Sequence, residues 1–309
     1  MKEYIFPVPG NVPECHASTL VRFPGGGVLA AWFGGTKEGN DDVQIWLSRR
    51  TASGWSEPVC VTKEAGIPHW NPVLYRHEDG VLSLYYKSGH HIPYWKTMVV
   101  ESADEGETWS DARELVRGDE GGRGPVKNKP IKISNGALLA PASIEQGPWR
   151  CFADVSRDGI TWEKKPIPVE NDAINMIQPS LWEHPEGHIH ALMRTSGGYI
   201  YRSDSDDFGE TWCTAYSTSI PNNNSGLDCV RMEDGRIALV CNPVEKNWGP
   251  RSPLSVFVSD DNGASFRKLM DLETEPGEYS YPAVISHGNR LYITYTWNRR
   301  TIAFRELEL

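Results

Sequence analysis

Ser102-Ala-Asp-Glu-Gly-Glu-Thr-Trp109 is a motif that the chain repeats as Ser205-Asp-Asp-Phe-Gly-Glu-Thr-Trp212 and Ser259-Asp-Asp-Asn-Gly-Ala-Ser-Phe266. All three follow the pattern S-x-D-x-G-x-[T/S]-[W/F]. A fourth copy, 156–162, is one residue shorter, and a fifth, 48–55, keeps only the serine, a glycine and the tryptophan. The serines that open the copies are 54, 54, 49 and 54 residues apart. Such a fixed period is typical of an array of similar supersecondary units.

A second repeat runs in phase with these copies of the motif, which we call Asp boxes. A glycine turn followed by an apolar, alternating run occurs six times, at Gly26, Gly80, Gly136, Gly187, Gly235 and Gly288. Asp-Gly or Asn-Gly between such runs predicts a β-hairpin. In the boxes, Asp and Ser side chains can accept hydrogen bonds from nearby backbone N–H groups, and glycine allows a positive φ. The boxes are therefore expected to be structural turns on the rim, without a catalytic role.

Six units of this size predict an all-β fold, a six-bladed β-propeller with Asp-box turns. Sustained helical periodicity is absent from the sequence, and a closed array of this length is expected to form one domain over residues 1–309. The last unit has no box after it, whereas a short apolar stretch, 4–8, precedes the first unit. We therefore expect an N-terminal strand to complete the last blade and close the ring, which removes free sheet edges.

Composition excludes several classes of partner and cofactor. The net charge of -10 argues against nucleic acid, and no apolar run is long enough to cross a bilayer. Six cysteines without a C-x-x-C pair, and no visible signal peptide, predict cytoplasmic residence, with an extracellular location as the alternative if a leader is missing. Neither His90-His91 nor His188-x-His190 has further ligands at metal-binding spacing, so no metal is expected; without a phosphate loop or dinucleotide fingerprint, no cofactor is expected.

Chemistry in a propeller is expected where the inner strands of all blades begin, because these positions converge on one mouth. Counting nine or ten residues back from each hairpin glycine gives a mostly polar ring: His16, Trp70, Asn71, Lys127, Gln178, Ser225, Gly226 and Tyr279. Lys129 and Asp228 lie close to this ring in sequence and are included as substrate-binding candidates. Convergent polar groups of this kind predict a binding pocket.

The boxes, the six units and this ring resemble the sialidase (neuraminidase) superfamily, and most of all its BNR-type predicted sialidases, over essentially the whole chain. In that family an arginine of the first blade binds the substrate carboxylate; here His16 stands at its position. A fourth-blade glutamate activates the nucleophile there; here Gln178 replaces it. Arg194 in Leu-Met-Arg-Thr195 and Arg251 in Gly-Pro-Arg-Ser-Pro-Leu254 match the second and third family arginines. Tyr279-Ser280 matches the pair that contains the nucleophilic tyrosine.

The family's acid/base aspartate comes from the loop after the first strand. The matching loop, 34–42, offers Glu38, Asp41 or Asp42. Two arginines suit a substrate carboxylate, through charge-assisted hydrogen bonds. The resemblance and the arginines together predict an acidic saccharide as the substrate, either a sialic-type or a uronic acid. Aromatic side chains expected near the mouth could stack on sugar faces: Trp32, Trp70, Tyr94, Trp95 and Trp248.

The departures from the family pattern leave three hypotheses open. A phenol with a pKa of about 10 needs a base before it attacks a sugar; Gln178 cannot serve, whereas a histidine with a pKa of about 6.5 can. The first hypothesis is a retaining exo-glycosidase with Tyr279 as nucleophile, His16 as its base and an acid from the 38–42 loop. The second is a uronate lyase, in which His16 removes a proton and Tyr279 protonates the leaving oxygen. The third is a sugar-binding propeller without catalysis.

Overall fold

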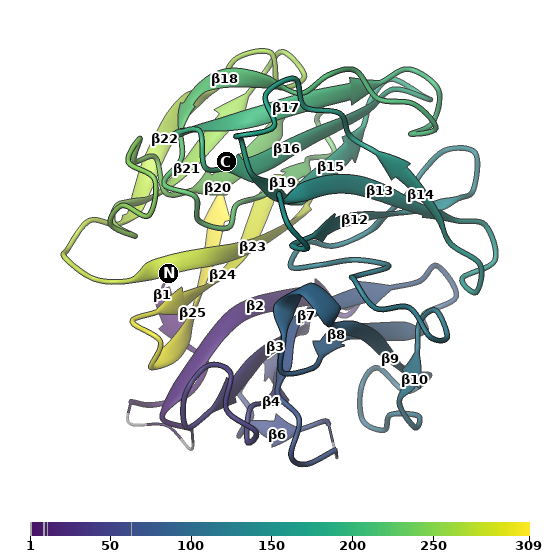
Figure 1. Cartoon of the computed structure of the whole chain (residues 1–309). Helices are drawn as coiled ribbons and strands as arrows, with labels where there is room; N and C mark the ends of the chain where they lie inside the picture. The colour runs from purple at the N-terminus through teal and green to yellow at the C-terminus, as the bar shows by residue number, and fades with distance from the viewer. Residues whose placement is uncertain (1, 9, 11, 63) are drawn as a thin grey trace.

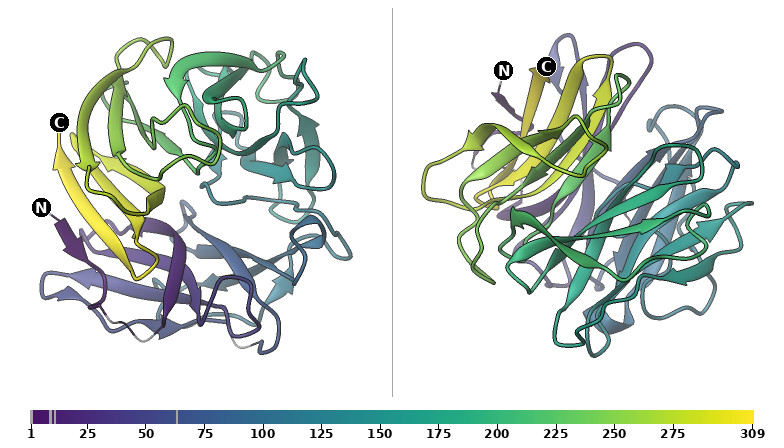
Figure 2. Two further views of the ribbon diagram at one scale, coloured as in Figure 1. Left: turned by 60° about the vertical axis from the view of Figure 1, so that its left-hand side comes forward. Right: turned by 90° about the horizontal axis from the view of Figure 1, so that it is seen from above.

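The computed structural model describes residues 2–8, 10, 12–62 and 64–309. Six antiparallel sheets surround one axis, so the predicted all-β, six-bladed propeller is confirmed (Figure 1). A second view shows the sheets arranged as a ring (Figure 2). Within the described residues, the one helical element is a 3₁₀ turn, η1 (Ile92–Tyr94).

The first three blades follow the order of the sequence. Blade 1 consists of β2 (Glu14–Arg22), β3 (Val28–Gly35), β4 (Gln44–Thr51), β5 (Gly54–Trp55) and β6 (Val59–Cys60). Blade 2 consists of β7 (His69–Arg76), β8 (Leu82–Ser88), β9 (Lys96–Ser102) and β10 (Arg113–Glu114). Blade 3 consists of β11 (Ile131–Lys132), β12 (Leu138–Ile144), β13 (Arg150–Ser156) and β14 (Glu163–Pro166).

The last three blades complete the ring. Blade 4 consists of β15 (Met176–Glu183), β16 (Ile189–Thr195), β17 (Tyr199–Ser205) and β18 (Tyr216–Pro221). Blade 5 consists of β19 (Asp228–Arg231), β20 (Ile237–Cys241), β21 (Leu254–Ser259) and β22 (Arg267–Glu273). Blade 6 consists of β23 (Tyr279–His287), β24 (Arg290–Trp297) and β25 (Thr301–Glu308), with β1 (Lys2–Tyr4) at its edge.

The N-terminal strand closes the ring as predicted. β1 pairs with β25 antiparallel, with Lys2 opposite Arg305 and Tyr4 opposite Ala303. The strand is shorter and begins earlier than the apolar stretch 4–8 suggested. Phe6 leaves the sheet and stacks on the buried Trp32 ring, at 5.1 Å between ring centroids. Apolar residues that follow β1 therefore bind the closing strand to the core as well as to its neighbour.

The Asp boxes are turns held by their own side chains, as expected. In the box that begins at Ser102, Thr108 donates two hydrogen bonds to Asp104, from N at 2.9 Å and from Oγ1 at 2.6 Å. The backbone N–H of Gly106 donates to Ser102 Oγ at 2.8 Å. The boxes that begin at 205 and 259 repeat this set of bonds, and the shorter box at 156 keeps most of it.

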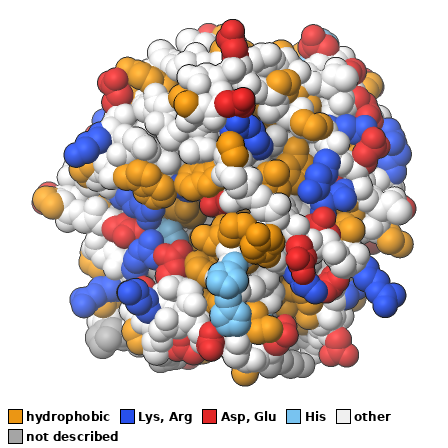
Figure 3. All heavy atoms as spheres, viewed as in Figure 1, with side chains coloured by type: hydrophobic (Ala, Val, Ile, Leu, Met, Phe, Trp, Pro, Cys, Tyr) orange, Lys and Arg blue, Asp and Glu red, His pale blue; other side chains and the backbone are white. Residues whose placement is uncertain are grey.

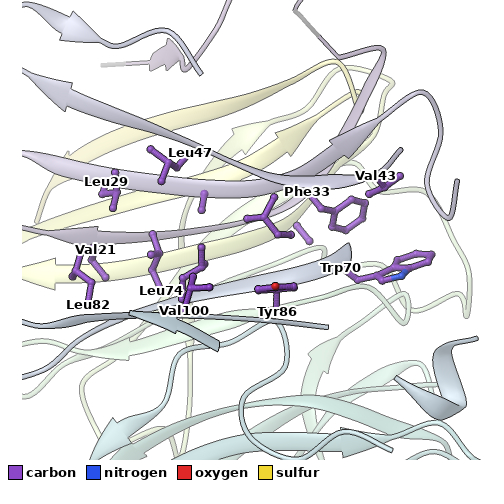
Figure 4. Packing of buried hydrophobic residues seen from close by; sticks show 14 of the residues in the cluster. Val21, Leu29, Phe33, Val43, Leu47, Trp70, Leu74, Leu82, Tyr86 and Val100 are labelled. Carbon is purple, nitrogen blue, oxygen red and sulfur yellow. The ribbon is translucent and has the colours of Figure 1, made fainter. Parts of the chain in front are cut away.

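Hydrophobic side chains from facing blades fill the space between the sheets. Between blades 1 and 2, Leu29 and Leu82 are fully buried and pack with Val21, Leu74 and Val100 (Figure 4). Because successive side chains of a strand point to opposite faces, each blade buries apolar residues against both of its neighbours. The ring is therefore a stable frame, and the ends of its strands are held in fixed positions around the axis.

Candidate active site

A cavity of about 290 Å³ opens where the inner strands begin. Its walls come from two kinds of segment: the starts of several inner strands, and the connections between the second and third strands of five blades. The first kind contributes His16, Trp70, Asn71, Ile177, Gln178 and Tyr281; the second contributes Glu38, Ile92, Trp95, Glu145, Trp149, Trp248, Arg251 and Arg299. Arg194, near the end of β16, completes the wall. Hydrophobic side chains gather across the centre of the face shown in Figure 3, with basic and acidic side chains among them.

Four of the inner strands, β2, β7, β15 and β23, share a backbone irregularity at this mouth. Ala17, Asn71, Gln178 and Tyr281 have positive φ values of 53°, 44°, 54° and 52°. At each of them the pairing with the second strand shifts in register. A β-bulge redirects side chains that would otherwise alternate across the sheet. The bulges therefore allow neighbouring residues, such as Trp70 and Asn71, to line the same cavity.

The tyrosine in the cavity is Tyr281, and this corrects the expected position of Tyr279. Tyr279 is 4% exposed and belongs to a hydrophobic core cluster, where its ring lies 6.3 Å from that of Trp297. The two-residue difference arises in the hairpin. In blade 2, Gly80 lies three residues after His77, whose N–H donates to Val81 O just beyond β7, whereas in blade 6 Gly288 directly follows His287, which pairs with Arg290. Counting back from the glycine therefore overshoots by two residues in blade 6.

Arg194 occupies the centre of the cavity wall. Its guanidinium is buried and donates hydrogen bonds to Asn224 Oδ1 at 3.0 Å, Gln178 Oε1 at 3.1 Å and Tyr281 Oη at 2.6 Å. The rings of Trp149 and Trp248 each lie 5.9 Å from its Cζ atom. Among the described residues, no acceptor is bound to Nη2. A buried guanidinium with one unused nitrogen atom, Nη2, is suited to bind an oxygen of a carboxylate that enters the cavity.

Two further arginines face the same space, and Glu278 holds both. Arg251 Nη1 lies 2.6 Å from Glu278 Oε1, and Arg299 Nε donates to the two carboxylate oxygens at 3.0 and 3.1 Å. Arg251 therefore lines the cavity as predicted, although one of its nitrogen atoms is already paired. Arg299 was not predicted. It lies in the turn between β24 and β25, and it also forms an ion pair with Glu38.

His16 lies beside Tyr281, with 4.2 Å between their ring centroids. Its Nδ1 is 2.8 Å from Thr296 Oγ1, and Nε2 has no hydrogen-bond partner in the described part of the chain. Burial is the main cause that holds the pKa of His16 well below its ordinary value. Nearby positive charges lower it further, and Arg299 has the strongest effect among them. The imidazole is therefore neutral at neutral pH, a form that can accept a proton.

The 38–42 loop contributes one of its three candidate carboxylates to the cavity. Glu38 lines the wall. Asp42 instead accepts hydrogen bonds from Thr36 N and Thr36 Oγ1, both at 2.9 Å, and Asp41 lies 2.9 Å from His90 at the surface. These placements correct the expectation for both aspartates, because the turn and the neighbouring loop already bind their oxygens.

Lys127, Lys129 and Asp228 lie deeper along the axis, and we call them the channel cluster. Lys129 Nζ donates to both oxygens of Asp228, at 3.0 and 2.9 Å. Asp228 also accepts from Ser180 Oγ at 2.7 Å and from Val284 N at 2.8 Å. Lys127 Nζ donates to Asn128 Oδ1 and to the carbonyl oxygens of residues 227 and 282. The expectation that these residues contact substrate is corrected, because protein atoms fill their hydrogen-bonding capacity.

Of the aromatic residues expected at the mouth, Trp70, Trp95 and Trp248 line the cavity. Trp32 is fully buried in the core, and Tyr94 is 59% exposed outside the cavity. The residues that the sequence reasoning missed are Glu145, Trp149 and Arg299. All three lie in connections between second and third strands, which reach the same mouth as the starts of the inner strands. A search of those connections, once the blade repeat was known, would have found them.

A cavity larger than the axial one lies elsewhere. It measures about 890 Å³ and runs between the outer strands of blades 1 and 2, beside the box that ends at Trp109. The axial cavity is the stronger candidate because buried charged groups from several blades converge there. Within the described residues, no His, Cys, Asp or Glu cluster is placed to hold a metal ion, and no helix is long and apolar enough to cross a membrane.

Comparison with known proteins places this six-bladed propeller in a family of repeat domains. The model of the BNR repeat-like domain matches residues 26–293, so the chain belongs to that family. A search of curated proteins finds no match.

Solved structures share the fold at low sequence identity. A protein of unknown function from Dyadobacter fermentans is 17% identical with a TM-score of 0.80, and the match covers 100% of this chain and 98% of that one. The Hadza microbial sialidase Hz136 is 16% identical with a TM-score of 0.82, covering 100% of this chain and 68% of its own. Trypanosoma rangeli sialidase in complex with sialic acid is 17% identical with a TM-score of 0.75, covering 98% of this chain and 56% of its own.

Proposed function

We propose that the protein is a retaining glycosidase that removes a terminal acidic sugar, with Tyr281 as the nucleophile. The observation that carries this proposal is the 2.6 Å hydrogen bond from Arg194 to the Tyr281 hydroxyl, inside a cavity that two more arginines line. A charge-assisted hydrogen bond to the phenol oxygen stabilises the negative charge that develops when its proton leaves. The sialidases among the structures that share this fold support a glycosidase, since sialidases use a tyrosine nucleophile.

The charges of the cavity favour an acidic substrate. Three guanidinium groups face the space or border it, whereas Glu38 and Glu278 supply two carboxylates already paired with them. The free Nη2 of Arg194 and the unpaired nitrogen atoms of Arg251 can bind a sugar carboxylate. Indole rings beside Arg194 offer apolar faces on which a sugar ring can stack.

In the proposed first step, Tyr281 Oη attacks the anomeric carbon and passes its proton to His16. His16 is placed for this role, because its Nε2 is unoccupied and its ring lies beside that of Tyr281. A carboxylic acid on the cavity wall protonates the departing oxygen, so the aglycone leaves as an alcohol. Water then releases the sugar from the tyrosine, and the proton on His16 returns to the phenolate.

Elimination from a uronate is a second candidate, and one observation favours it. Gln178, which takes the place of the family glutamate, is neutral and accepts a hydrogen bond from Arg194 at 3.1 Å. With a neutral amide at this position, no negative charge repels the enolate that forms during elimination. His16 could remove the proton on the carbon next to the substrate carboxylate.

A two-part assay separates these functions. The protein is incubated with sialosides and with uronate oligosaccharides, while released sugar and the absorbance of an unsaturated uronate are both recorded. Hydrolysis without that absorbance supports the glycosidase, and its appearance supports the lyase. A fluorinated acidic-sugar fluoride then traps the intermediate, and peptide mass spectrometry is expected to find the sugar on Tyr281. Turnover with the label on another residue contradicts the proposed nucleophile, and silence on every substrate contradicts catalysis.

A further inference from the structure

Glu145 is a carboxyl group on the cavity wall that the proposed reaction has not yet used. It directly follows β12, at the start of the connection between the second and third strands of blade 3. It shares the cavity with Arg194 and Tyr281. No hydrogen-bond or ion-pair partner of its carboxyl group is present among the described residues, unlike Glu38, whose oxygen is bound by Arg299.

The backbone around Glu145 is held in place although its carboxyl group is free. The next residue, Gln146, donates from Nε2 to Pro93 O at 2.6 Å, which ties the connection to blade 2. At its other end, the backbone N–H of Trp149 donates to Asn175 Oδ1 at 2.9 Å, which ties it to blade 4. A catalytic group on a fixed segment meets the requirement for positioning at a reacting atom.

The surroundings of Glu145 favour its protonated form. Burial raises the pKa of this carboxyl group above its ordinary value, and the Arg194 guanidinium opposes that rise only in part. The other titratable groups on the cavity wall are His16, Glu38, Tyr281, Arg251 and Arg299. Of the two wall carboxyl groups, Glu145 is thus the one without a cation bound to its oxygens. A carboxyl group with a raised pKa in a cleft is a functional candidate, because a general acid must carry its proton at the working pH.

We propose that Glu145 is the general acid and base of the glycosidase reaction put forward above, on which this assignment rests. In the first step its proton moves to the glycosidic oxygen as the bond from that oxygen to the anomeric carbon breaks. In the second step the Glu145 carboxylate takes a proton from water, whose oxygen bonds to the anomeric carbon as the bond to Tyr281 breaks. The two steps consume one water and return every group to its starting state.

The test compares leaving groups. The wild type, Glu145→Gln and a control, Glu170→Gln at an exposed position, are assayed with 4-methylumbelliferyl and methyl glycosides of N-acetylneuraminate and of glucuronate. An aryl leaving group departs with little help from an acid, whereas methanol needs a proton. Glu145→Gln is therefore expected to lose roughly 10²–10⁴-fold in kcat/KM on the methyl glycoside and far less on the aryl glycoside. The wild type is expected to lose kcat/KM at alkaline pH as Glu145 gives up its proton, and this fall should disappear in Glu145→Gln.

Equal losses on both glycosides, or an unchanged alkaline fall, would overturn the assignment and indicate a structural role. Thermal unfolding of each variant identifies misfolding, and Glu145→Asp, which keeps the acid, is expected to recover part of the methyl-glycoside rate. Failure of the proposed nucleophile has a different signature: Tyr281→Phe would stay active while the leaving-group dependence of Glu145→Gln remained. A wild type inactive on all four glycosides overturns the general-acid assignment together with the glycosidase.

Discussion

The channel cluster and the arginines of the cavity are two groups of charged residues near the same axis. They differ in how many of their polar atoms are bound by other protein atoms. In the channel, each charged atom of Lys127, Lys129 and Asp228 is bound by other protein atoms. In the cavity, Nη2 of Arg194 stays free, and no hydrogen bond or ion pair within the described residues reaches the Glu145 carboxyl group. A buried charge without a partner is costly, so open groups are retained where a ligand can complete them.

Whether a charged side chain is fully bound by protein atoms therefore distinguishes structural from functional charges, whatever the residue type. Asp228 connects its own blade 5 with three others: Lys129 from blade 3, Ser180 from blade 4 and the Val284 N–H from blade 6 all donate to it. Arg194 likewise binds groups from other blades, yet it does so beside open space. We therefore expect substitutions in the channel to change the free energy of unfolding, and substitutions in the cavity to change turnover.

The largest expected effect is on turnover, and it compares two tyrosines of one strand. Tyr281→Phe is expected to lower kcat by roughly 10²–10⁴-fold, because the hydroxyl that acts on the sugar is gone. Tyr279→Phe is the matched control and is expected to leave kcat nearly unchanged, since that ring lies in the core. Steady-state rates of both variants, with unfolding midpoints, provide the measurement. A loss of turnover in Tyr279→Phe but not in Tyr281→Phe would show that Tyr279 is the reacting tyrosine.

The next effect concerns stability. Asp228→Ala leaves Lys129 and several donors unpaired, and removing one partner of a buried ion pair costs about 3–5 kcal/mol in the free energy of unfolding. Asp261→Ala, in an exposed Asp box, is expected to cost much less, because its partners remain open to water. Urea unfolding measures both. If folded Asp228→Asn protein showed a raised KM with unchanged stability, the channel cluster would belong to the substrate site after all.

The smallest effect is a dependence of stability on pH. Burial lowers the pKa of Lys127 to about 7 from 10.5, so the unfolded chain binds more protons than the folded chain between these values. Stability should therefore rise with pH through this window, by at most about 1.4 kcal/mol per pH unit for this one group. Lys127→Met is expected to show a shallower rise between about pH 7 and 9, whereas the exposed control Lys246→Met should match the wild type. Identical slopes in all three proteins would mean that the buried ammonium keeps an ordinary pKa.

The architecture was predictable because it depends on interactions between residues that are close in the sequence. An Asp box binds its own backbone, and a hairpin glycine needs only its own turn, so each can be recognised from a few neighbouring residues. Repetition then fixed the number of blades and placed His16 and Gln178 at the mouth, since a constant number of residues separates the hairpin from the bulge. Arg194 and Arg251 came from the family resemblance and lie where it implied.

The site depended on what repetition does not specify. In the β23–β24 hairpin of blade 6 the glycine lies two residues nearer the strand than in the other blades. Counting back from it therefore predicted Tyr279 where the cavity has Tyr281. Glu145 and Arg299 come from connections that differ in every blade, so no periodic pattern identifies them. Whether a charged residue near the axis is satisfied or open depends on atoms contributed by other blades, up to 155 residues away for Lys127. The sequence by itself therefore determined the frame, because its signals are local. Only the tertiary structure separated the residues that hold the frame together from those left facing the cavity, because that distinction depends on contacts between blades.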